Sequence, residues 1–63
     1  MYYFIYAKDS SMKRFQPLDV AEGTVQQSIL YATMFYSKDE ATEIMERLSV
    51  QHPHISFKLV KKG

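Results

Sequence analysis

An apolar stripe with helical spacing runs through the second half of the chain. Between Ser37 and Pro53, apolar residues recur at i, i+3, i+4 and i+7, and charged residues fill the positions between them. The stripe consists of Ala41, Ile44, Met45 and Leu48. Ser37 is a helix-capping residue, and Glu40 three positions later matches a capping box. The pattern predicts a helix from about 38 to 50 that ends before Pro53.

Strand patterns occur on both sides of this helix. Residues 2–7 are β-forming on both faces, as in an inner strand that is covered on each side. Residues 9–11 have turn chemistry, and residues 12–18 alternate weakly up to Pro17, which favours an edge strand in a hairpin. Residues 55–60 alternate between apolar and polar positions, as in a half-buried strand.

The segment between the hairpin and the helix completes the fold prediction. Residues 19–24 are expected to form a loop in which Gly23 takes a positive φ. Residues 29–36 are expected to form a third strand, with a helix as the alternative for part of the run. The resulting order is β-β-β-α-β. It predicts an α+β two-layer sandwich, a four-stranded and mostly antiparallel sheet with one helix on one face.

The length and composition favour self-association. The 63 residues make one domain, 1–63, and a chain this short buries only about 60% of the surface that its unfolded form exposes. It has no cysteine for a disulfide or a thiolate zinc site. Five tyrosines and four phenylalanines are many for so small a core, and aromatic side chains left on a sheet face are typical of an interface. We therefore expect a homodimer.

The strand at residues 2–7 is the expected contact. Tyr3 and Ile5 are the first choice for the interface, and their opposite-face neighbours are expected to meet the helix. Those neighbours are Tyr2, Phe4 and Tyr6. The opposite register exchanges the two sets, because a slip of one residue moves every side chain to the other face.

No catalytic or metal-binding constellation is indicated. His52 and His54 are interpreted as solvated imidazoles in the loop after the helix, because a tetrahedral zinc site needs more ligands than these two. Three carboxylates share one helical row and are interpreted as a solvated helix face: Asp39, Glu43 and Glu46. The expected function is that of a non-enzymatic binding module without catalytic residues, cofactor or metal.

The alternative function is the binding of single-stranded nucleic acid. The net charge of +1, from eight basic and seven acidic residues, gives no global signal for a polyanion. The basic residues nevertheless gather in the hairpin and the last strand, near tyrosines on which bases could stack. They are Lys8, Lys13, Arg14, Lys58, Lys61 and Lys62. Lysines on an edge strand also protect it against edge-to-edge pairing, which is the purely structural explanation.

The chain has no secretory apolar region and no run of about 18 apolar residues. Together with the absence of cysteine, this suggests a cytoplasmic protein that does not enter a membrane. In its length and its lack of an active-site motif, the chain resembles the small accessory proteins of phages and mobile elements, including anti-CRISPR inhibitors of host defence. The resemblance is one of size, without a shared motif. It implies action by binding to and inhibiting a host system.

Overall fold

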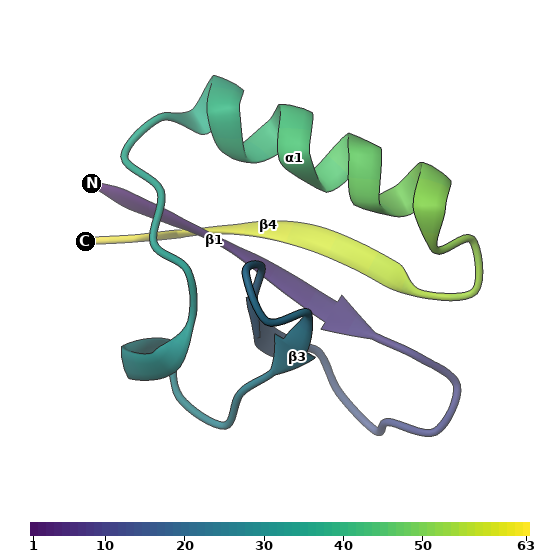
Figure 1. Ribbon diagram of the computed structural model, residues 1–63. Coiled ribbons are helices and arrows are strands. Elements are labelled where there is room, and N and C mark those ends of the chain that lie inside the picture. Colours follow the sequence, from purple (N-terminus) through teal and green to yellow (C-terminus); the bar gives the residue numbers. More distant parts are fainter.

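A four-stranded antiparallel sheet forms one layer of the structure, and a single helix forms the other (Figure 1). The computed structural model describes residues 1–63. The strands are β1 (Tyr2–Lys8), β2 (Gln16–Asp19), β3 (Thr24–Val25) and β4 (Ser56–Lys62), in the spatial order β3-β2-β1-β4. The helix α1 spans Lys38–Gln51, and a short 3-10 helix, η1, spans Ile29–Tyr31. The predicted α+β class is confirmed.

β1 is an inner strand, as its apolar residues on both faces predicted. It pairs with β4 along all seven of its residues, but with β2 only at Tyr6 and Ala7. One reason for the short pairing is that β2 contains Pro17, which has no N–H to donate to the ladder. The rest of this edge of β1, from Tyr2 to Ile5, is therefore open to a different segment.

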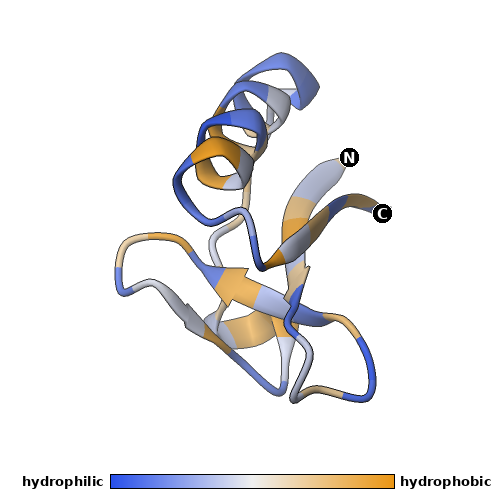
Figure 2. Ribbon diagram, turned by 90° about the vertical axis from the view of Figure 1, so that its right-hand side faces the viewer, coloured by the Kyte–Doolittle hydropathy of each residue, from blue (hydrophilic) through white to orange (hydrophobic).

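The core lies between α1 and the sheet face that α1 covers. Its buried residues are Ile5, Ala7, Leu18, Phe35 and Ala41. Partly buried apolar side chains pack around them: Tyr3, Val20, Ile44, Met45, Leu48, Ile55, Phe57 and Leu59. The predicted helix stripe and the alternating positions of the last strand thus meet in one cluster. Most of the remaining α1 residues are hydrophilic, and much of the α1 ribbon is accordingly blue in Figure 2.

The helix begins where the sequence predicts. The Ser37 side chain accepts a hydrogen bond from the backbone N–H of Glu40 at 3.2 Å, which satisfies one of the free donors of the first turn. The reciprocal bond of a capping box, from the Ser37 N–H to the Glu40 carboxylate, is not formed. The helix ends at Gln51, and the N–H of His52 bonds to the Leu48 carbonyl at 2.8 Å.

The prediction of a third strand at residues 29–36 is wrong. The third strand is the short β3, and residues 29–31 form η1, whose first turn is capped by the Ser28 side chain. Phe35 forms an isolated bridge to Tyr3 with N···O distances of 2.8 and 2.9 Å, and the Thr33 N–H donates to the Leu18 carbonyl of β2 at 3.2 Å. β2 pairs with this edge of β1 only at Tyr6 and Ala7, so the edge beside Tyr3 is free. The chain reaches it only at Phe35, two residues before Ser37 caps α1.

The β2–β3 hairpin is a second difference, because the sequence suggested only a loop there. Gly23 takes the predicted positive φ, at +70°, and its N–H bonds to the Asp19 carbonyl at 2.8 Å. The turn brings Thr24 and Val25 back alongside β2. The expected conformation of the glycine is confirmed, and the strand that it creates was not expected.

The faces of β1 are also the reverse of the first choice made from the sequence. Tyr3 and Ile5 face α1, and Ile5 has no exposed surface. By the alternation of a strand, the residues expected to meet the helix lie on the other side: Tyr2, Phe4 and Tyr6. The sequence did not decide between the faces because large apolar side chains occupy both.

Candidate functional site

The sheet face turned away from α1 is the candidate functional site, and we call it the open face. Side chains directly opposite each other on antiparallel strands share a face. The open face therefore carries Tyr2, Phe4, Tyr6 and Lys8 from β1. Opposite them on β4 are Lys62, Val60, Lys58 and Ser56. Three aromatic side chains of β1 thus lie beside a row of β4 that contains two lysines.

One end of the open face is covered by the chain itself. Phe4 points away from α1, yet only 4% of its surface is exposed. The segment that contains η1 lies beside it, and Leu30, Met34, Phe4 and Tyr2 line a shallow groove of about 420 Å³. The second face of β1 is therefore covered in part by the segment at residues 29–36, which the sequence had predicted to be a strand.

A patch of exposed apolar side chains surrounds this groove. The Tyr36 ring packs edge-on to Tyr2, with 5.5 Å between the ring centres, and Tyr36 is 73% exposed. Leu30 is 84% exposed, and Met34 and Tyr2 are each exposed over about two-fifths of their surface. We call these four residues the apolar patch. The two chain termini lie side by side at the same end of β1 (Figure 1).

The other end of the open face is basic. The Lys58 ammonium lies over the Phe15 ring, 4.6 Å from the ring centre, in a cation–π contact. Arg14, Phe15 and Tyr6 line one polar hollow of about 550 Å³, and no acidic residue takes part in it. Lys8 follows Tyr6 on the same face of β1. These residues are the basic end: Tyr6, Lys8, Arg14, Phe15 and Lys58.

The two layers of the molecule differ in charge. β1 and β4 together contain four lysines and no acidic residue. The helix α1 contains four acidic and two basic residues, and it covers the opposite face of the sheet. The part of the open face that β1 and β4 form is therefore positive, although the net charge of the molecule is only +1 and β2 contributes the acidic Asp19.

The six basic residues predicted for nucleic-acid binding do not all meet. Lys8, Lys58 and Lys62 lie on the open face, and Arg14 lies beside Tyr6 and Phe15. Lys61 points to the opposite face, where it shares a shallow hollow with Tyr3 and Lys38. Lys13 is exposed in the connection between β1 and β2.

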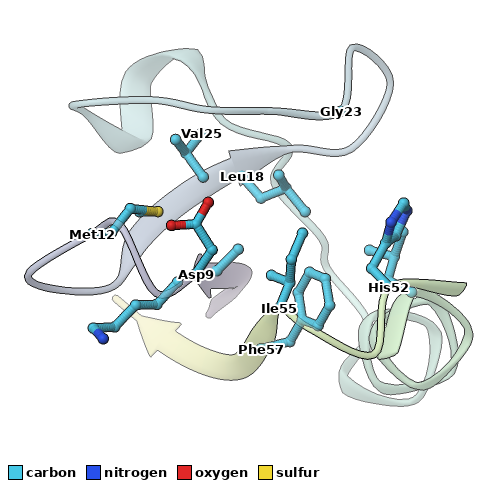
Figure 3. A pocket seen from close by; sticks show the side chains of 11 residues that line it. Asp9, Met12, Leu18, Gly23, Val25, His52, Ile55 and Phe57 are labelled. Carbon is cyan, nitrogen blue, oxygen red and sulfur yellow. The ribbon is translucent and has the colours of Figure 1, made fainter. Parts of the chain in front are cut away.

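A second groove, which the sequence analysis did not anticipate, lies at the end of α1 (Figure 3). Its volume is about 220 Å³, and its walls include Leu18, Val25 and Phe57. The Asp9 carboxylate and the His52 imidazole stand on opposite sides, with apolar side chains between them (Figure 3). The groove therefore does not bring these two groups together as an acid–base pair.

Asp9 is held in its place by the turn that follows β1. Its carboxylate accepts hydrogen bonds from the side chain of Ser11 at 2.6 Å and from the backbone N–H of Ser11 at 2.8 Å. Both bonds favour the ionised form and lower the pKa of Asp9 from its ordinary value of 3.8, and the bond from the Ser11 side chain has the larger effect of the two. The predicted turn at residues 9–11 is thus present, and its role is structural.

The remaining titratable groups are dispersed over the surface. His52 and His54 are exposed, and no three His, Cys, Asp or Glu side chains are placed to hold a metal ion together. Glu43 pairs with Arg47 at 3.2 Å, but both side chains are more than three-fifths exposed, so the pair adds little stability. The structure also has no helix with the length and apolar character that a membrane crossing requires.

Comparison with known proteins identifies no relative: no family model, no curated protein and no solved structure matches this chain. The function is therefore inferred from the residues and the geometry of the open face.

Proposed function

We propose that the protein is a non-enzymatic binding module that forms a homodimer through the apolar patch. The observation that carries this proposal is the exposure of Leu30, Met34, Tyr36 and Tyr2 around one groove. Contiguous exposed apolar side chains on a small soluble domain mark interaction sites. Tyrosine and methionine are also among the residues enriched at protein interfaces.

The size of the core supports the same proposal. Only seven of the 63 residues are buried, and no disulfide links the strands. A core this small supplies only a few kcal/mol, so small domains commonly gain stability from a partner subunit. Burial of the apolar patch against a second copy removes apolar surface from water, which stabilises both copies.

The partner that covers the apolar patch is a second copy of the chain, because the same patch can form both sides of a twofold interface. In such an interface the same surface meets itself, and twofold dimers are the commonest homo-oligomers. Lys62 lines the groove beside Tyr2 and gives the patch a polar edge, as the rims of interfaces generally have.

Sedimentation velocity over a wide concentration range tests this proposal. The wild-type protein is expected to shift from monomer to dimer as its concentration rises. Leu30→Ser is expected to weaken the dimer, because it places a hydroxyl in the patch. Val50→Ser is the matched control: Val50 is 83% exposed, close to the 84% of Leu30, but it lies on α1.

Two results would contradict the proposal. One is a monomer at every concentration up to millimolar. The other is a dimer that Val50→Ser and Leu30→Ser weaken equally, because an interface elsewhere would then be required. Circular dichroism of each variant confirms that the fold is retained, as expected for substitutions at exposed positions.

A further inference from the structure

The basic end of the open face is left free when the apolar patch is occupied, since the two lie at opposite ends of β1. Its three cations are Lys8, Arg14 and Lys58, and neither the hollow nor the strands β1 and β4 contain an acidic residue. The acidic residues nearest in the chain are Asp9, whose carboxylate is bonded to Ser11, and Asp19 at the end of β2. The acidic residues of α1 lie in the other layer. This charge distribution complements a polyanion.

Two aromatic rings lie among these cations. Phe15 and Tyr6 line the same hollow, and the Lys58 ammonium stands 4.6 Å from the centre of the Phe15 ring. Both rings are half-buried, so they are held in place while part of each ring remains accessible. Proteins that bind single strands combine cations that follow the phosphates with aromatic rings on which the bases stack.

We propose that the basic end binds single-stranded nucleic acid. The cations contact phosphates, and Tyr6 and Phe15 provide stacking surfaces for unpaired bases. A duplex keeps its bases stacked on one another, so it offers phosphates but no free base faces to these rings.

The positions of the lysines on β4 distinguish nucleic-acid binding from the protection of a sheet edge against pairing. β4 is an edge strand, and lysines that only prevent edge pairing serve on either face. Lys58 and Lys61 are both exposed residues of β4, but Lys58 lies on the open face and Lys61 on the other. Nucleic-acid binding requires Lys58 and not Lys61.

The experiment is fluorescence anisotropy with a labelled oligothymidylate at increasing salt concentrations. Three phosphate contacts predict that the logarithm of the binding constant falls with the logarithm of salt with a slope of about −2. Lys58→Ala and Arg14→Ala are each expected to weaken binding and to reduce the steepness of this slope by about 0.7. Lys61→Ala, the matched control, should leave both quantities unchanged.

The contribution of the rings is tested with Phe15→Leu, which keeps an apolar side chain and removes the flat ring. It should weaken binding roughly fivefold or more, since stacking of a base on an aromatic ring contributes about 1–3 kcal/mol. Circular dichroism confirms that each variant is folded. Leu30→Ser should bind like the wild type, so this proposal and the dimer proposal can fail separately.

Several results would overturn the inference. They are the absence of binding at low salt, equal losses for Lys58→Ala and Lys61→Ala, and a duplex of the same length bound as tightly as the single strand. Polyglutamate bound as tightly as the oligonucleotide would also overturn it, because charge alone would then explain the binding.

Discussion

At the scale of single residues, Asp9 shows how a local turn fixes a charge. Both hydrogen bonds to its carboxylate come from Ser11, two residues later, and both favour the ionised form. Because the pKa of Asp9 is lower in the folded protein, the turn stabilises the fold at pH values above the ordinary value of 3.8. This contribution is lost as the pH falls through the lowered pKa.

Ser11→Ala is therefore expected to raise the pKa of Asp9 toward 3.8, since it removes the hydrogen bond that lowers this pKa most. The measurement is an NMR titration of the Asp9 carboxyl signal. Ser10→Ala is the control, because the Ser10 hydroxyl makes no hydrogen bond in the structure. An unchanged pKa in Ser11→Ala would show that the side-chain bond does not persist in solution.

At the scale of elements, the start of α1 depends on one side chain. Ser37→Ala removes the acceptor for the Glu40 N–H and is expected to lower the free energy of unfolding by about 1 kcal/mol. Ser37→Asp should be nearly neutral, because a carboxylate also accepts this bond. Urea denaturation at a fixed protein concentration measures both. Equal effects would mean that the helix does not depend on this cap.

The packing of α1 on the sheet gives a second prediction for this element. Leu48 is half-buried and packs against the core beside Phe57 and Ile55. Leu48→Ala should lower the free energy of unfolding by about 2 kcal/mol, near the lower end of the range for buried leucines, because the side chain is not fully enclosed. Val50→Ala, on the exposed side of the same helix turn, should change it by less than about 0.5 kcal/mol. Urea denaturation tests both, and similar values for the pair would argue against this helix face as the core.

At the scale of the whole molecule, stability and assembly are coupled. If the protein forms a homodimer through the apolar patch, its melting temperature should rise with protein concentration, because dimerisation stabilises the folded state by mass action. Leu30→Ser should remove this dependence, and Val50→Ser should keep it. Differential scanning calorimetry at several concentrations measures the effect. A wild-type melting temperature that is independent of concentration would oppose the dimer.

Features that depend on neighbours in the chain could be predicted from the sequence. The cap at Ser37, the apolar stripe of α1 and the turn at Asp9 each rest on residues a few positions apart. The positive φ of Gly23 is equally local. These elements, with the alternation in β4, were enough to identify a small α+β fold and the core between helix and sheet.

Features that depend on pairing were decided only by the tertiary structure. Residues 29–36 have strand-forming side chains, but the chain passes the free edge of β1 only at Phe35, which bridges to Tyr3 shortly before α1 begins. Both faces of β1 are apolar, so packing against α1 decided that Ile5 lies inside and Tyr2 outside. The sequence places six basic residues in the hairpin and the last strand, whereas the register of β4 puts Lys58 and Lys61 on opposite faces. Local propensity is a property of neighbouring residues, and the choice of edge and face belongs to contacts between segments distant in the chain.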